Sequence, residues 1–140
     1  MKITDLLSQR IVIIDGAMGT MIQKYKYSEE DYRGTRFANF DHPLKGNNDL
    51  LTLTQPQIIK DIHKEFLMAG SDILETNTFN SNVISMADYY MEDLVVELNV
   101  EAVKLAKQAI AEYQSEVENR PLFVAGAMGP TNKTASLSPD

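Results

Sequence analysis

The four residues GAMG occur twice in this 140-residue chain, at 16–19 and at 126–129, each time after a short apolar run. Glycines at a strand end let a ligand approach the backbone, and free N–H groups at the start of a helix attract an anion. In the first copy Asp15 could bind an ammonium group, while the amides of Gly16 and Ala17 could bind a carboxylate. The first copy therefore predicts a site for a small polar ligand. The same residues would also suit a tight turn in which Asp15 caps the next helix.

A dinucleotide-binding turn is an alternative interpretation of the first copy. Such a turn requires G-x-G-x-x-G and an acidic residue about 20 positions later, at the end of a second strand. The spacing here is G-x-x-G, and residues 33–40 (RGTRFANF) contain no acid, so we discount this alternative. In the second copy Pro130 prevents a helix from starting. We therefore expect the second copy to shape a neighbouring wall of one pocket, not to form a second phosphate site.

The motif ETNTFN follows another apolar run and is dense in hydrogen-bonding side chains. The carboxyl ends of parallel strands are where α/β proteins place their binding groups. Glu75, Thr76 and Asn77 are therefore candidate ligand-binding residues. The motif could also be a polar turn that leads into a helix capped by Asn80 or Ser81, and both descriptions can hold together.

The candidate residues are separated by strand and helix patterns. Three short apolar runs predict buried strands: residues 10–15, 71–75 and 122–126. Their hydrophobicity is continuous, as in parallel strands covered on both faces. Helical periodicity predicts a short helix in the first ten residues and further helices over residues 54–69, 82–90 and 92–118. The alternation of strand and helix predicts right-handed crossovers and a parallel sheet, an α/β fold.

The two long helices carry clear packing faces. The first is expected to begin with a capping box between Thr54 and Gln57, and Gly70 follows its end. Apolar side chains recur on one face of each helix: Ile58, Ile59, Ile62, Phe66 and Leu67 in the first, and Leu94, Leu98, Ala102, Leu105, Ala109 and Tyr113 in the second. These faces predict the core.

Residues 26–48 are too long and polar for a plain connection, which indicates a functional loop or an added excursion. The chain ends soon after the third strand, and three parallel strands would leave a bare edge. We therefore expect residues 1–140 to be the N-terminal part of a larger domain, incomplete at its C-terminus. A (β/α)8 barrel of about 250 residues would have this much chain in its first three βα units. Such a fragment could also associate through its exposed strand edge.

The composition excludes several classes of partner and site. The net charge of −7, with thirteen scattered basic residues, argues against nucleic acid. The longest apolar run, residues 11–14, is too short for a membrane span, and no signal peptide is evident, so we expect a cytoplasmic protein with no membrane partner. Cysteine is absent, so the chain has no disulfide, thiol nucleophile or thiolate metal ligand. We expect His63 to pack or lie at the surface, and His42 has no second ligand at metal spacing.

Three longer segments together resemble the start of the cobalamin-dependent methionine synthases. They are IVIIDGAMGTMIQ, KGNNDLLTLTQPQIIKDIHKEFLMAGSDILETNTFNS and VAGAMGPTNKTASLSPD. The resemblance runs over essentially all 140 residues, in the same order and with the same long loop. The motif D-G-x-x-G-T alone indicates only the broader homocysteine S-methyltransferase family. ETNTFN and GPTNKTASLSPD are typical of the homocysteine-binding module of the methionine synthases.

The resemblance implies a (β/α)8 barrel that binds homocysteine at the carboxyl ends of its strands, with the sulfur on a zinc ion. Zinc would keep the thiol ionised near neutral pH, where a free thiol with a pKa of about 8.5 is mostly protonated. The thiolate would take the methyl group of methylcobalamin, giving methionine. Further modules of the full-length chain would bind cobalamin and methyltetrahydrofolate, which returns a methyl group to the cobalt.

The resemblance also assigns residues to the homocysteine pocket. Those expected to bind or line it are Asp15, Gly16, Ala17, Glu75, Thr76, Asn77, Gly129 and Thr131. The family's zinc ligands are cysteines, so here they are expected beyond residue 140. The fragment is thus expected to hold no catalytic residue and no metal, and to be inactive alone.

Two alternatives remain open from the sequence. One is a cobalamin-independent homocysteine methyltransferase that takes its methyl group from a sulfonium or betaine donor. The other is a non-enzymatic domain that binds a small ligand and stands alone at 140 residues. The excursion and KGNNDLL favour the cobalamin enzyme over the first alternative.

Overall fold

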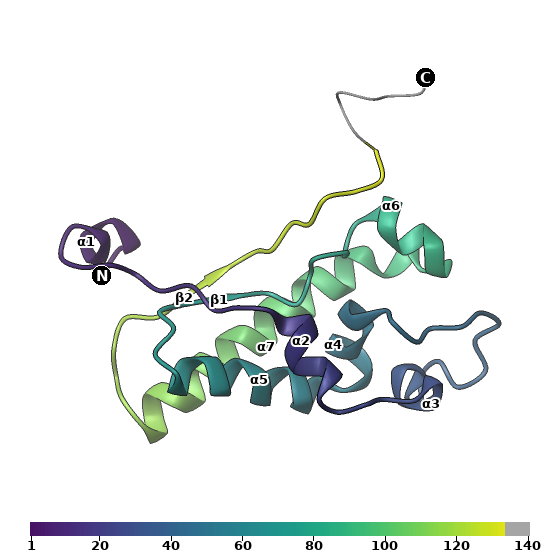
Figure 1. The fold of residues 1–140 in the computed structure, drawn as a ribbon, viewed down its shortest axis with the longest axis horizontal. Coiled ribbons are helices and arrows are strands. Elements are labelled where there is room, and N and C mark those ends of the chain that lie inside the picture. The colour runs from purple at the N-terminus through teal and green to yellow at the C-terminus, as the bar shows by residue number, and fades with distance from the viewer. Residues whose placement is uncertain (134–140) are drawn as a thin grey trace.

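The computed structural model describes residues 1–133 as a mixed fold of helices around a short parallel sheet (Figure 1). The α-helices are α1 (Ile3–Leu7), α2 (Met18–Gln23), α3 (Glu29–Arg33), α4 (Leu51–Thr54), α5 (Pro56–Met68), α6 (Val83–Met86) and α7 (Val95–Glu116). Three 3-10 turns are η1 (Asn48–Leu50), η2 (Ala87–Tyr89) and η3 (Glu92–Leu94). The strands are β1 (Ile73–Glu75) and β2 (Phe123–Ala125). None of the helices in residues 1–133 has both the length and the apolar character to cross a bilayer.

The sheet is parallel, as predicted, but the first of the three predicted strands does not form a ladder. β1 pairs with β2 over three residues each, whereas residues 10–15 make only an isolated parallel bridge from Ile14 to Ile73. Backbone hydrogen bonds still hold this segment beside β1, with Asp15 N donating to Ile73 O at 2.9 Å and Asp72 N donating to Ile13 O at 2.7 Å. The chain path of a third strand is therefore present without its regular pairing.

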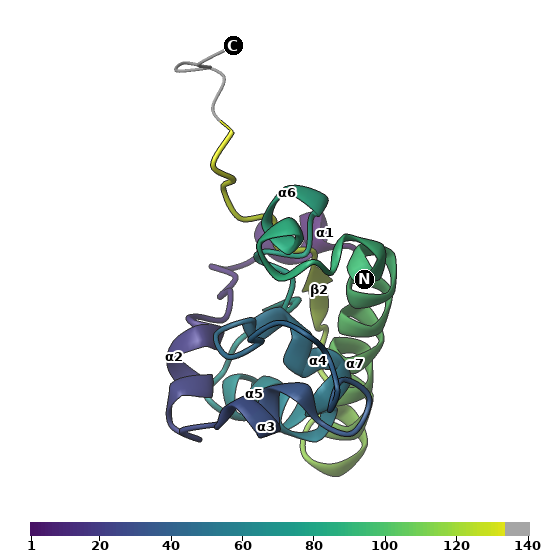
Figure 2. The ribbon, with the colours of Figure 1, turned by 90° about the vertical axis from the view of Figure 1, so that its right-hand side faces the viewer.

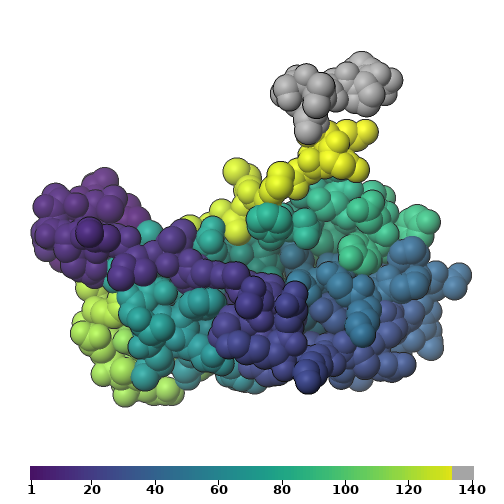
Figure 3. All heavy atoms as spheres, viewed as in Figure 1, coloured from purple at the N-terminus to yellow at the C-terminus, as the bar shows by residue number. Residues whose placement is uncertain are grey.

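The prediction that both faces of residues 10–15 are covered is wrong for the described chain. α5 and α7 pack against each other and against one side of the strands (Figures 1 and 2). On residues 10–15, in contrast, Ile11 is 87% exposed, and Ile13 and Ile14 are about half exposed. The purple segment lies at the surface in Figure 3. Its continuous hydrophobicity therefore did not predict its burial.

The first long helix is interrupted, and the predicted capping box is not formed. Thr54 ends α4 and its hydroxyl donates to Leu50 O at 3.3 Å, while Gln55 adopts a non-helical conformation with φ −135° and ψ 53°. Pro56 then starts α5, because proline lacks the N–H that a helix interior needs but fits its first turn. Gly70 follows α5 at φ +106°, a left-handed conformation that favours glycine and redirects the chain toward β1.

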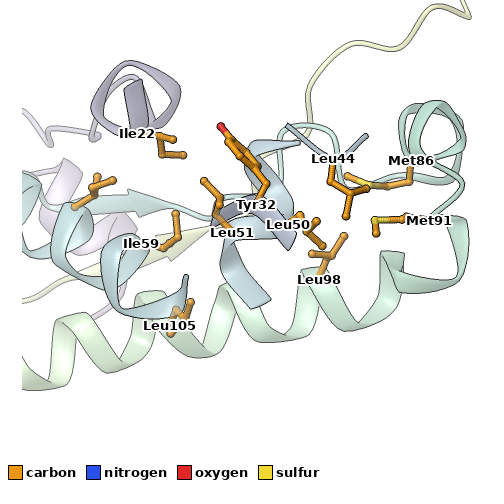
Figure 4. Close-up of a cluster of buried hydrophobic side chains, with 11 residues drawn as sticks. Ile22, Tyr32, Leu44, Leu50, Leu51, Ile59, Met86, Met91, Leu98 and Leu105 are labelled. Carbon is orange, nitrogen blue, oxygen red and sulfur yellow. The ribbon is translucent and has the colours of Figure 1, made fainter. Parts of the chain in front are cut away.

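The core forms on the predicted helix faces, which confirms the periodicity argument. One cluster joins the excursion, α4, α5 and α7 and is shown in Figure 4: Ile22, Tyr32, Leu44, Leu50, Leu51, Ile59, Ile62, Met86, Met91, Leu98 and Leu105. A second cluster lies under the strands: Leu67, Leu74, Ala106, Ala109 and Tyr113. Fully buried alanines on α7 let α5 approach closely. Salt bridges from Lys60 and Lys64 to Glu112 join the exposed sides of the two helices.

The excursion over residues 26–48 is an ordered element that contains α3. Glu29 holds it together, since its carboxylate accepts from Leu44 N and Lys45 N at 2.7 Å each and pairs with Arg33 at 2.8 Å. Tyr32 on α3 is buried in the first core cluster. The excursion therefore packs on the domain and delivers the chain to η1.

The amino ends of the three parallel segments are joined by one buried carboxylate. Asp72 accepts two hydrogen bonds from Arg10 and one from Arg120, each at 2.7 Å, and one from Ile13 N at 3.0 Å. The Arg10 hydrogen bond is the main cause that lowers the pKa of Asp72 to about 2. Arg120 also donates to Ser71 O at 2.9 Å. This clamp fixes where each parallel segment begins.

Replacing Asp72 by alanine should lower the free energy of unfolding by roughly 3 kcal/mol, because two arginines lose their buried partner. Because the folded pKa lies below the unfolded value, the contribution of Asp72 is present above about pH 4 and is lost as the pH falls toward 2. Urea unfolding at pH 7 and pH 3 measures both effects. Asp41→Ala, at an exposed position, is the matched control. Equal effects of the two substitutions at pH 7 would contradict the clamp.

His63 provides a second stability prediction. It is fully buried in α5 without a hydrogen-bond partner within residues 1–133, and burial lowers its pKa to about 4. The folded protein therefore favours the neutral ring, and stability is lost as the pH falls from about 6.5 to 4. Relative to the parent protein, His63→Leu should gain about 3 kcal/mol in unfolding free energy between pH 7 and pH 4. A difference that stays constant over this range would show that His63 does not titrate on unfolding.

Candidate functional site

A cavity of about 390 Å3 opens beside the carboxyl ends of the parallel segments, within the usual size range of small-molecule sites. Four stretches of chain line it: Gly16, Ala17, Met18 and Gly19; Asn48 and Asp49; Glu75, Thr76, Asn77, Phe79 and Asn80; and Ala127 and Met128. Both GAMG copies therefore contribute to the same cavity. The two copies lie together because their segments run parallel on either side of β1.

The structure brings together five of the eight residues that the sequence assigned to a pocket: Gly16, Ala17, Glu75, Thr76 and Asn77. Asp15 lies immediately behind them and is 9% exposed. Gly129 and Thr131 are not in the lining. The second copy contributes Ala127 and Met128 instead.

Asp15 joins the first segment to β1. Its Oδ1 accepts from Glu75 N at 3.0 Å, so the carboxylate continues the pairing that the backbone does not complete. Burial raises the pKa of Asp15 to about 6, although the Glu75 N–H lowers it; the Glu75 charge raises it further. The alternative in which Asp15 caps α2 is wrong, since the N-cap residue is Ala17 and makes no side-chain cap. A ligand cation near Asp15 would stabilise its charged form.

Thr76 and Thr78 tie the turn after β1 to the second GAMG copy. Ala127 N donates to the Thr76 hydroxyl at 3.1 Å, and the Thr78 hydroxyl donates to Ala127 O at 2.9 Å. The two hydroxyls are 2.6 Å apart. Because the Thr78 proton is used on Ala127 O, the Thr76 hydroxyl donates to Thr78. Both hydroxyl protons are therefore engaged within the protein.

Gly129 and Thr131 do not line the cavity but make hydrogen bonds outside it. Gly129 N donates to Phe79 O at 3.0 Å, and a Cβ at this position would lie 2.5 Å from Phe79 O. Only glycine fits this close approach. The Thr131 hydroxyl makes its hydrogen bonds to Lys133, at 3.2 Å. The rest of the family-specific motif, residues 134–140, lies outside the described residues.

Asn48 and Asp49 line the cavity and were missed by the sequence analysis. Asp49 is 2% exposed, and its Oδ2 accepts from Asn80 N at 2.8 Å and from the Ser81 hydroxyl at 2.7 Å. Burial raises the pKa of Asp49. The rule that binding groups follow strands could not find these residues, because they lie in η1, ahead of α4, and follow no strand. The only signal was the KGNNDLL segment within the resemblance.

The helix after the cavity is capped differently from the prediction. Asn82, and not Asn80 or Ser81, caps α6 by accepting from Ser85 N at 2.9 Å. Ser81 is instead used to hold Asp49. The polar turn ETNTFN is thus both a structural turn and part of the cavity wall.

The described residues do not fit a zinc site. The chain has no cysteine, and residues 1–133 contain no group of three histidine, aspartate or glutamate side chains that could hold a metal ion. The cavity lining does contain carboxylates, on Asp49 and Glu75, and side-chain amides, on Asn48, Asn77 and Asn80. Such a lining suits the ammonium and carboxylate of an amino acid.

The profile of the homocysteine S-methyltransferase family matches residues 12–140. Crystal structures of the homocysteine methyltransferase MmuM from Escherichia coli have a similar fold. The metallated form has a TM-score of 0.69 at 22% identity and matches 90% of this chain; the oxidized form has 0.72 at 22% and matches 91%. The apo form has a TM-score of 0.57 at 21% identity over 86% of this chain.

The match covers 37–40% of each MmuM chain, so this sequence spans about two fifths of the length of those proteins. At such identity the likeness shows the fold: the mixed helix and sheet structure resembles a fragment of the homocysteine methyltransferase fold. The family profile, in contrast, extends over nearly the whole sequence. The chain therefore belongs to the homocysteine S-methyltransferase family.

Proposed function

We propose that this chain is the N-terminal part of the homocysteine-binding domain of a cobalamin-dependent methionine synthase. In this proposal residues 1–140 are the first three βα units of a (β/α)8 barrel. The cavity carries the proposal, since it joins both GAMG copies and ETNTFN at the carboxyl ends of parallel segments. The family match and the partial coverage of MmuM support it.

The residues of this chain would bind the amino-acid end of homocysteine. Asp15 and Glu75 offer carboxylates to the ammonium group, and the amides of Gly16 and Ala17 offer donors to the carboxylate. Thr76 and Asn77 would line the same pocket, with Gly129 and Thr131 supporting the second rim. Binding in this orientation would direct the sulfur away from these segments.

The methyl transfer itself requires groups outside this chain. The proposed zinc ligands are cysteines beyond residue 140, and the cobalamin and folate modules would belong to the same full-length protein. Bound zinc would supply the ionised sulfur near neutral pH. We further propose a cytoplasmic location, and that residues 1–140 alone make no methionine.

A cobalamin-independent homocysteine methyltransferase is the second candidate. The structural likeness to MmuM, at about 22% identity, leaves the methyl donor open. Both candidates require homocysteine as the acceptor. They differ only in the donor of the methyl group.

An assay of the full-length protein with homocysteine and alternative methyl donors tests the proposal. We expect methionine to form with methylcobalamin, and methyltetrahydrofolate to sustain turnover. Methionine formed only with a sulfonium or betaine donor would establish the second candidate. If homocysteine were neither bound nor methylated with any donor, the family function would not apply to this protein.

Asp15→Asn in the full-length protein should raise the KM for homocysteine roughly 10- to 100-fold, because a charged hydrogen bond to the ammonium group is lost. The zinc content should be unchanged, since Asp15 is assigned to the amino-acid end. Homocysteine affinity of the parent protein should fall as the pH falls through about 6, where Asp15 becomes protonated. Steady-state kinetics and metal analysis measure both effects, with exposed Asp41→Asn as control. Loss of zinc from Asp15→Asn would place this carboxylate in the metal site instead.

A further inference from the structure

The described lining of the cavity contains no cationic side chain. Its ionisable members are Asp49 and Glu75, and Asp15 lies just behind them. Within residues 1–133, therefore, a substrate carboxylate in this cavity can be bound only by neutral donors. These must be backbone N–H groups or the hydroxyl and amide side chains of the lining.

Most neutral side-chain donors of the lining are already engaged. The Thr76 hydroxyl donates to Thr78, and the Asn77 amide donates to Asn48 O at 2.9 Å and to the Thr52 hydroxyl at 3.2 Å. Asn80 is exposed, and no group in residues 1–133 orients its side chain. Of the four donor side chains, Asn48 remains.

Asn48 is held in one orientation from outside the cavity. Its Oδ1 accepts from the Tyr32 hydroxyl at 2.7 Å, whereas its Nδ2 has no partner in residues 1–133. The Nδ2 atom faces the first GAMG copy, since a Cβ built on Gly19 would lie 3.5 Å from it. Because Oδ1 is occupied, the two N–H bonds of Nδ2 are the free polar groups of this side chain.

Tyr32 is well suited to fix this amide. It is 7% exposed, lies on α3 within the first core cluster, and sits where the excursion packs on α4. Burial raises the pKa of its hydroxyl, so the group stays protonated and acts as the donor to Asn48. Packing in the core therefore fixes the Tyr32 ring, and the hydrogen bond from its hydroxyl fixes the Asn48 amide.

We propose that the Asn48 side-chain amide donates a hydrogen bond to the carboxylate of the amino-acid substrate, and that Tyr32 is the positioning residue that keeps the amide in this orientation. This inference rests on the proposed homocysteine function. The inference gives the excursion a role, because residues 26–48 contain both Tyr32, which provides the positioning hydroxyl, and Asn48, which provides the amide that binds the substrate. The carboxylate thus lies between Asn48 and the first GAMG copy.

Binding to the full-length protein tests the inference with two ligands that differ only in the carboxylate. Homocysteine carries it, and 3-aminopropanethiol lacks it while keeping the thiol and the amine. Asn48→Ala should weaken homocysteine binding roughly 10- to 100-fold, the usual cost of a hydrogen bond to a charged group. The same substitution should change the affinity for 3-aminopropanethiol by less than about twofold.

Tyr32→Phe removes only the hydroxyl and should weaken homocysteine binding less than Asn48→Ala does. In the Asn48→Ala background it should have no further effect on binding, because its action passes through that amide. A purely structural role would instead weaken both ligands and add to the effect of Asn48→Ala. The matched controls are Asn119→Ala and Tyr25→Phe, two positions outside the cavity lining. Melting temperatures of all variants show whether each is folded.

The outcomes separate this inference from the function on which it rests. If the parent protein binds no homocysteine, the proposed function fails. If the parent binds homocysteine but Asn48→Ala weakens both ligands equally, or neither, the assignment of Asn48 to the carboxylate is overturned. If Asn48→Ala is unfolded, Tyr32→Phe with the same two ligands decides, and equal weakening of both overturns the inference.

Discussion

The buried carboxylate of Asp72 is the interaction on which the arrangement of the parallel segments depends. The ladder of β1 and β2 is only three residues long, and residues 10–15 contribute a single bridge. Pairing this short is marginal without further support. Asp72 supplies the support, since arginines from the two flanking segments and the Ile13 N–H converge on it. Fixing the amino ends of three parallel segments also fixes where their carboxyl ends, and so the cavity, must lie.

The carboxyl ends are held by the same kind of interaction, in which a side chain replaces missing backbone pairing. Asp15 bonds to Glu75 N, and Thr76 and Thr78 bond to the backbone of Ala127. These bonds fix the walls of the cavity before any ligand binds. A preformed cavity of this kind avoids much of the entropy that ordering a loop would cost on binding.

The sequence predicted the features that depend on local periodicity and failed on those that depend on distant partners. The faces of α5 and α7 follow from residue spacing alone, and so does the parallel direction of β1 and β2. The break at Gln55 and the half-exposed Ile13 were missed, because both depend on how the excursion and the sheet pack. For the cavity, the strand-end rule found Glu75 and its neighbours. It could not find Asn48, which is brought to the cavity by contacts with α3 and not by a strand.

The electrostatics of the cavity indicate how ligand binding and stability are linked. Asp15 and Asp49 are both buried, and burial raises the pKa of each, so their charged forms destabilise the folded protein at neutral pH. An ammonium group in the cavity would offset part of this cost. The free energy recovered in this way would strengthen binding of the ligand that carries the ammonium group. The proposed zwitterionic ligand requires both carboxylates and neutral donors, and both kinds of group lie at or beside this preformed cavity of about 390 Å3.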